Sequence, residues 1–231
     1  MYWMDLSGGD PTFYRDLLGW HAADDGVFTV DGQVVAGHGA PGRPGWNLHT
    51  VVDDVMATCA AAERQGGKVL TAPGSAPLAM LADPTGAEFV VREPNREADL
   101  RTRPMLFSWA ELCTPDAEAA RSFYSAVFGW TTVDIVMSMP AGDVGYTVFL
   151  DGAEEAGGLL PAEGAFGTAP PPYWLAYVEA ADADKLAAHA AELGGTVVVE
   201  PFDVPRIGRI ALLAGRSGET FAVMQLPGDG R

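Results

Sequence analysis

The chain has 231 residues and a formal net charge of −17, from 31 acidic and 14 basic residues. This balance argues against a nucleic-acid partner, because phosphates are neutralised by Lys and Arg. A hydrophobic fraction of 48% and a charged fraction of 19% are typical of a globular protein rather than a disordered one. The sequence has no run of about 18 apolar residues, so we expect no membrane span. It does not start with a basic segment followed by an apolar one, so we expect no signal peptide and a cytoplasmic protein.

In chain order, each half of the sequence predicts a strand, a helix, a hairpin, another strand, another helix and closing strands. The pattern is clearest in the second half. There the predicted strands are 106–113, 144–150, 156–160, 196–199, 208–214 and 219–225. One predicted helix begins near residues 114–116, and a second spans 181–193. Asp116 or Thr114 can cap the first of these helices, and Gly129 can end it.

The two halves repeat one another. The matched segments are 5–20 with 111–130, 46–52 with 174–179, and 83–91 with 215–223. We therefore expect residues 1–93 and 105–227 to form two domains, residues 94–104 to form a linker, and residues 228–231 to form a frayed tail. The first half is trimmed, because eight positions separate Asp5 from Phe13 and twelve separate Glu111 from Phe123. The second half is thus expected to have the more complete cleft wall.

Four motifs together resemble the vicinal oxygen chelate superfamily. They are W-x-[DE]-L, F-Y-x-x-[LV]-[LF]-G-W, an Ala-rich helix ending in Gly-Gly, and D-P-x-G-x-x-F. This superfamily includes glyoxalase I, bleomycin-resistance proteins, fosfomycin-resistance enzymes and extradiol dioxygenases, and the chain is most similar to tandem glyoxalase-like members of actinobacterial type. The resemblance implies an α+β fold, in which a tandem repeat of paired βαβββ modules builds curved mixed sheets that form open barrels or clefts.

The resemblance also implies where a catalytic metal would be held. The corresponding positions are Trp3 and Trp109 in the opening strands, Asn47 and Leu175 in the second modules, and Val90 and Ala222 in the last strands. None is a His or a carboxylate, although His49 and Glu88 lie two positions away on the same strand faces. Neither half gathers three good ligands, so we expect no metal site and no cofactor.

Strand alternation predicts which side chains face the clefts. Each half places a Trp and a carboxylate two positions apart, and therefore on one face of the strand. We expect a small organic ligand with a flat apolar body to contact Trp3, Asp5, Asn47, His49, Trp109, Glu111, Tyr177 and Met224. The structural alternative is that each acid caps a backbone group or pairs with an arginine such as Arg92 or Arg209.

The residues and the resemblance lead to two main functional hypotheses. The first is metal-independent binding of a bulky aromatic or amphipathic molecule, for antibiotic sequestration, self-resistance or an accessory role in natural-product biosynthesis. The alternative is an enzyme of the superfamily, of lyase, isomerase or oxygenase type, acting on a small organic substrate. A metal-free enzyme would use Glu111, Asp5 or His49 as acid or base. Other readings remain open. His49 can have a role in the core, the Cys113 thiol can be inert, and the protein can be a scaffold with vestigial clefts. A homodimer is also possible.

Overall fold

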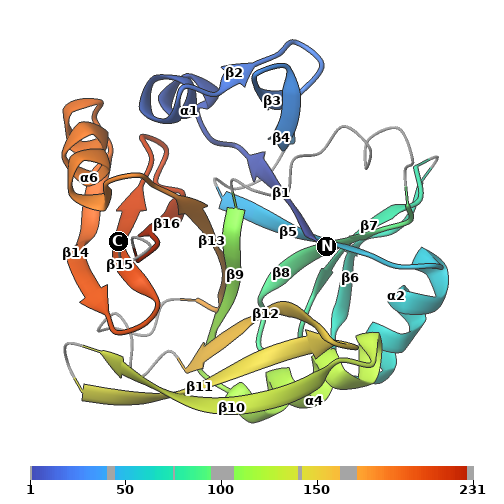
Figure 1. Cartoon of the computed structure of the whole chain (residues 1–231). Helices are drawn as coiled ribbons and strands as arrows, with labels where there is room; N and C mark the ends of the chain where they lie inside the picture. Colours follow the sequence, from blue (N-terminus) through green and yellow to red (C-terminus); the bar gives the residue numbers. More distant parts are fainter. Residues whose placement is uncertain are drawn as a thin grey trace.

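The computed structural model describes residues 2–40, 45–74, 76–94, 107–139, 142–161 and 171–227. Its strands form two eight-stranded mixed sheets (Figure 1). Sheet A has the order β2-β3-β4-β1-β5-β8-β7-β6, and sheet B has the order β10-β11-β12-β9-β13-β16-β15-β14. The predicted linker, apart from its first residue, and the predicted tail lie outside the described residues. No helix in the described part of the chain is both long enough and apolar enough to cross a membrane.

Each sheet is built from two copies of a strand–helix–three-strand module, which confirms the expected α+β architecture. The first half contains β1 (Tyr2–Ser7), α1 (Pro11–Leu18), β2 (His21–Ala22), β3 (Val27–Val30), β4 (Gln33–Ala40), β5 (Gly45–Val51), α2 (Val55–Arg64), β6 (Lys68–Thr71), β7 (Leu78–Ala82) and β8 (Glu88–Arg92). The second contains β9 (Phe107–Thr114), α4 (Ala117–Phe128), β10 (Thr131–Met139), β11 (Gly142–Asp151), β12 (Glu154–Pro161), β13 (Tyr173–Glu179), α6 (Ala183–Glu192), β14 (Thr196–Val204), β15 (Gly208–Ala214) and β16 (Thr220–Gln225).

The sequence pattern did not predict β10 as a strand, although this edge strand is nine residues long. Most of its side chains are exposed on both faces, so it lacks the apolar–polar alternation by which a half-buried strand is recognised. The trimming of the first half is visible in the helices, since α1 has eight residues and α4 has twelve. Asp10 and Asp116 cap the two helices, and Gly19 and Gly129 end them in the left-handed conformation.

The helix-bearing faces of the two sheets pack against each other in one hydrophobic core that takes residues from both halves. Aromatic rings join the halves directly. Tyr14 lies 5.4 Å from Phe221 between ring centroids, and Tyr124 lies 5.6 Å from Phe89. The opposite face of each sheet, called the concave face below, therefore points away from this core. In sheet B the edge strands β10 and β14 contact each other, so that sheet curls around its concave face.

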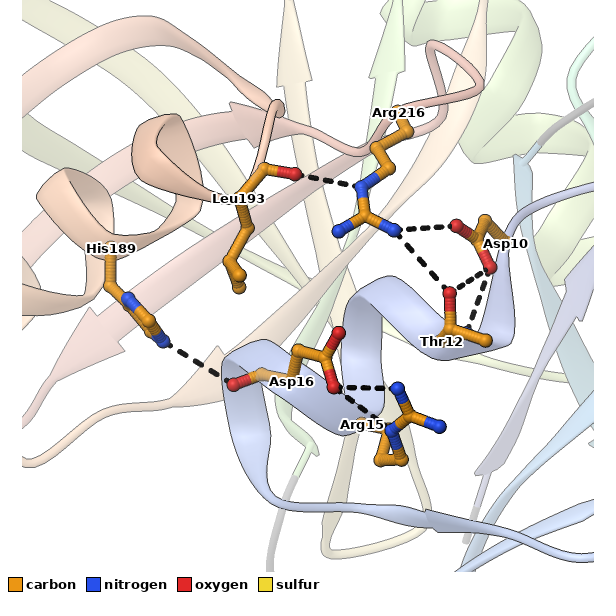
Figure 2. Close-up of polar contacts among 7 residues, drawn as sticks. All are labelled: Asp10, Thr12, Arg15, Asp16, His189, Leu193 and Arg216. Carbon is orange, nitrogen blue, oxygen red and sulfur yellow. Dashed lines mark hydrogen bonds and ion pairs between the residues drawn. The ribbon is translucent and has the colours of Figure 1, made fainter.

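Polar contacts also hold α1 against α6 and the turn between β15 and β16. Figure 2 shows Arg216 donating from Nη1 to Asp10 Oδ2 at 2.9 Å and from Nε to the carbonyl oxygen of Leu193 at 2.7 Å. The same view shows His189 Nε2 lying 3.3 Å from the carbonyl oxygen of Asp16. The first module of the chain is thus fixed to the last one, and α2 is in contact with α4 in the corresponding way.

Candidate functional site

Strand register brings the predicted residues of the second half together on the concave face of sheet B. Trp109 of β9 lies opposite Tyr177 of β13, and Tyr177 in turn lies beside Ala222 of β16. Glu111 lies opposite Leu175 in the next row. The alternate residues Ala110 and Leu112 belong to the core shared by the halves, so the concave face carries Trp109, Glu111 and Cys113 of β9. Met224 belongs to a second apolar cluster on this face.

A hydrogen-bonded network surrounds Glu111, and we call Trp109, Glu111, Cys113, Tyr146 and Tyr177 the Glu111 cluster. The Tyr177 hydroxyl donates to Glu111 Oε1 at 2.9 Å, and Cys113 Sγ donates to the same oxygen at 3.9 Å. Tyr146 lies close enough to the carboxyl group to lower its pKa, and the Tyr146 hydroxyl accepts from Trp109 Nε1 at 2.6 Å. Glu111 is only 3% exposed. Its contacts are phenols and a thiol, not an arginine.

Burial changes the protonation of this cluster. Burial raises the pKa of Glu111 to about 7, against the opposing effect of the nearby hydroxyls of Tyr177 and Tyr146 and the thiol of Cys113. Near neutral pH the carboxyl group therefore exists in both its neutral and its charged form. Burial, together with the charge of Glu111, raises the pKa of Cys113 well above its usual value, so the thiol remains protonated.

Two glycines make room for side chains on the concave faces of the two sheets. Gly158 lies beside Glu111 on the adjoining strand β12, and a Cβ at this position would collide with the Tyr146 hydroxyl. Gly37 has the equivalent place beside Asp5, and a Cβ there would collide with the Asp5 carboxylate. Tyr146 and these glycines were not predicted as site residues. A glycine inside a strand pattern is a signal of such a close approach and could have identified them.

A row of apolar β10 side chains, called the apolar margin below, lies on the same face as the Glu111 cluster. Ile135 of β10 pairs with Tyr146 of β11 and is 40% exposed, and Val133 on the same face is 47% exposed. Met137 and Met139 continue this row and are partly buried against the concave-face cluster. The buried members of that cluster are Cys113, Leu175, Tyr177, Val204, Ile210, Leu212, Ala222 and Met224. The concave face of sheet B is therefore predominantly apolar and aromatic around one carboxyl group.

The concave face of sheet A carries polar groups instead. His49 Nε2 lies 3.4 Å from Asp5 Oδ2, and Asn47 Nδ2 donates to Ser7 Oγ at 2.7 Å. His49 is 6% exposed, and burial followed by the nearby charge of Arg92 lowers its pKa to about 3. The imidazole is therefore neutral near pH 7.

The predicted site residues fall into two separate groups, one on each sheet. Trp3 lies opposite His49 in the register of sheet A, but its side chain lies outside what the structure describes. In sheet B, the suggested pairing of the acid with Arg209 does not occur. Arg209 bonds to Asp184 and Asp203 instead.

The metal positions implied by the resemblance can now be located by register. One row of sheet B joins Trp109, Tyr177 and Ala222, and the equivalent row of sheet A joins Trp3, His49 and Val90. The register thus places His49 and Tyr177, rather than Asn47 and Leu175, in these rows. Within the described ranges, no three or more His, Cys, Asp or Glu side chains are grouped so that they could hold a metal ion. Among the described residues, these rows therefore do not supply the three ligands of a metal centre.

One surface groove lies away from both concave faces, between α1 and α6. Its volume is about 450 Å³. The lining residues are Leu17, Leu18, Glu179, Ala180, Ala181, Asp182, Lys185, Leu186 and His189. None of the predicted site residues lies there, so the groove is separate from the Glu111 cluster.

Sequence comparisons connect both halves with one superfamily. Residues 106–223 match the family described as the glyoxalase/bleomycin resistance protein/dioxygenase superfamily, and residues 11–92 match a glyoxalase-like domain. CFP32 of Mycobacterium tuberculosis, provisionally named a glyoxylase, is 34% identical over 96% of this chain and 93% of its own length. The anthracycline biosynthesis protein DauV of Streptomyces sp. strain C5 is 31% identical over 97% of this chain and 92% of its own length.

The fold comparison agrees with the sequence comparison. The 2,3-dioxygenase LapB from Pseudomonas sp. KL28 superposes with a TM-score of 0.61 at 12% identity, over 96% of this chain and 90% of that one. At this level of identity the likeness concerns the fold alone. Because both halves match and full-length relatives exceed 30% identity, the chain belongs to the glyoxalase/bleomycin resistance protein/dioxygenase superfamily, as a tandem two-domain member.

Proposed function

We propose that the protein binds a bulky, flat, largely apolar organic molecule on the concave face of sheet B, without a metal ion, as an accessory protein of natural-product biosynthesis. The observation that carries the proposal is the Glu111 cluster, in which one carboxyl group lies among aromatic side chains. Aromatic walls with few, well-placed polar groups are typical of sites for small organic molecules.

The apolar margin of β10 supports the same proposal. Val133 and Ile135 expose apolar surface on the concave face, where a soluble domain gains nothing from it. Met137 and Met139, farther along the same strand, pack against the buried cluster. Methionine side chains are unbranched and adapt their shape readily, so they can move aside for a ligand that reaches Tyr146 and Trp109.

The names of two relatives suggest the class of ligand. DauV is named an anthracycline biosynthesis protein, and so is DnrV of Streptomyces peucetius, which is 33% identical over 53% of this chain and 48% of its own length. Anthracyclines contain fused flat rings, and such rings match the aromatic composition of the concave face. We therefore expect a polycyclic aromatic ligand, bound either for sequestration or for presentation to another enzyme.

Equilibrium dialysis with 2-(hydroxymethyl)anthracene tests the proposal, carried out with and without EDTA. We expect saturable binding that EDTA does not change. Ile135→Asp should weaken binding about tenfold or more, because it places a charge on the route to the cluster. Val136→Asp is the matched control: Val136 is 63% exposed and lies next in the strand, on the opposite face.

Three results would contradict the proposal in whole or in part. Absence of retention of the anthracene would remove the proposed ligand class. Equal loss of binding in Ile135→Asp and Val136→Asp would show that the ligand does not use the concave face. Loss of binding in EDTA would contradict the metal-independent part alone.

Metal-free acid–base catalysis is the second candidate. It is favoured by one observation, the pKa of about 7 at Glu111, since a general base works best when its pKa is close to the working pH. Asp5 and His49 remain candidates on the other sheet, although His49 gains a proton only at low pH. If the Glu111→Gln variant turned over an identified substrate at the full wild-type rate, Glu111 would not be the general base.

A further inference from the structure

We propose that β10 is an interface through which two copies of this chain associate, by pairing their β10 strands antiparallel with Ile135 opposite Ile135. Figure 1 shows β10 at the lower border of the molecule. The outer strand of a sheet has backbone N–H and C=O groups that no neighbouring strand satisfies, and another chain can pair with them. Formation of this interface needs no ligand, so it is independent of the proposed binding function.

Three of the four edge strands in the described sheets have features that prevent such pairing. β2 has two residues and β6 has four, so each offers only a short edge. β14 is nine residues long, but it contains Pro201, and its register against β15 shifts twice. Short strands, prolines and bulges are the devices by which proteins protect an exposed edge.

β10 has none of these features. It is nine residues long, contains neither proline nor lysine, and pairs with β11 over nine consecutive residues without a shift in register. Among the described strands it hydrogen-bonds only to β11, and its contact with β14 involves no strand pairing. Val133, Ile135 and Val136 are 47%, 40% and 63% exposed, so both faces of the strand are open in its central part. A long, regular and apolar edge of this kind is suited to pairing with another strand.

The sequence of β10 matches itself when the second strand runs antiparallel. With Ile135 on a two-fold axis, all nine residues of one copy lie opposite residues of the other, and opposite residues share a face. Val133 then lies opposite Met137 on the concave face, so an apolar row continues from one copy into the other. Asp134 lies opposite Val136 on the other face. A second copy of this chain is therefore the partner that the sequence of the strand fits.

The charges near β10 are compatible with this register. Asp134 is the only charged residue of the strand, and its Oδ2 accepts from Arg121 Nη1 of α4 at 2.9 Å. A register shifted by two residues would place Asp134 directly opposite itself, which is unfavourable. The net charge of −17 makes two copies repel each other at low ionic strength, and salt screens this repulsion.

Sedimentation equilibrium of the full-length protein in about 0.5 M NaCl tests the interface. We expect monomers and dimers in reversible equilibrium between about 1 and 200 µM, since a single strand pair is a small interface. Val136→Glu places a second carboxylate opposite Asp134 and should weaken dimerisation about fivefold or more, because the two-fold axis repeats the repulsion. Val136→Lys places an ammonium group there and should leave dimerisation at least as strong as in the wild type. Leu70→Glu is the matched control, on the edge strand β6, where Leu70 is 44% exposed.

Cysteine crosslinking tests the register. Ile135→Cys places two thiols opposite each other with about 4.5–5.5 Å between Cβ atoms, so oxidation by copper–phenanthroline should join the copies after a small adjustment. Both native cysteines are buried, so the introduced thiol is the one that the reagent reaches. Thr131→Cys is the matched control on the same face. Its thiol would lie about 27 Å from that of the second copy and should not crosslink.

Four results would overturn the proposal. A protein that stays monomeric at about 200 µM would show that β10 is not a dimer interface. Equal dimerisation of the wild type and Val136→Glu would place the interface elsewhere on the molecule. Equal weakening by Val136→Glu and Val136→Lys would contradict the register, and so would crosslinking of Thr131→Cys as fast as that of Ile135→Cys. None of these measurements uses a ligand, so their outcome leaves the proposed binding function to its own test.

Discussion

Tyr124 of α4 donates its phenolic hydrogen to Asp83 Oδ2 at 3.2 Å, from the second half of the chain to a turn of the first. Tyr14 of α1 makes the equivalent contact with Glu219 Oε1 at 3.1 Å, from the first half to the second. Each hydroxyl also accepts from a tryptophan of its own half, at 2.9 Å from Trp174 and 3.0 Å from Trp46. The repeated Phe-Tyr motif therefore joins the halves.

Tyr124→Phe should lower the free energy of unfolding by about 1–3 kcal/mol, because it leaves the buried Trp174 N–H and an Asp83 oxygen without their partner. Urea unfolding of the variant measures this loss. Tyr14→Phe removes the same pair of bonds on the other side and should have an effect of similar size. Both variants unfolding like the wild type would contradict a stabilising role for these contacts.

Gly158→Ala should lower the free energy of unfolding by about 1–3 kcal/mol, because the added Cβ would displace the Tyr146 hydroxyl from the Glu111 cluster. Near-UV circular dichroism should also change, since Tyr146 bonds to Trp109. Gly145→Ala is the matched control in β11, where an added Cβ meets no atom within 4 Å. A normal spectrum for Gly158→Ala would show that the cluster tolerates the displacement.

Glu111 makes stability fall as pH rises. Its pKa is about 7 in the folded protein against 4.5 for the free side chain, so the folded state binds the extra proton between these values. The stabilisation is complete below about pH 4.5 and is lost as pH rises through 7, by about 3 kcal/mol in total. Glu111→Gln should therefore gain stability relative to the wild type between pH 4 and pH 8. If the free energies of unfolding of the variant and the wild type differed by the same amount at every pH, the pKa of Glu111 would not be raised.

His49 has the opposite effect. Its pKa falls from 6.5 to about 3 on folding, so the unfolded state takes up the proton first as pH decreases. The contribution of His49 to the free energy of unfolding is complete above pH 6.5. It should decline by about 3 kcal/mol between pH 7 and pH 4. His49→Gln should abolish this part of the acid sensitivity. NMR of the imidazole nitrogens gives an independent check, since a His49 that titrates near pH 6.5 would refute the prediction.

The sequence determined the parts of this protein that depend on local pattern. The repeated motifs predicted two halves, the caps at Asp116 and Gly129 predicted the boundaries of α4, and the alternation of β9 predicted that Trp109 and Glu111 share a face. Glu111 and Asp5 were singled out because both halves place an acid two positions after a tryptophan. These features are fixed by residues a few positions apart.

The tertiary structure decided what surrounds those residues. Tyr146 of β11 and Tyr177 of β13 approach Glu111 from strands that are distant in the sequence, and Gly158 of β12 leaves the space that the Tyr146 hydroxyl occupies. The same acid position in the first half lies beside His49 instead. Protonation and hydrogen bonding depend on burial and on neighbours brought together by sheet register, and local sequence spacing does not specify either.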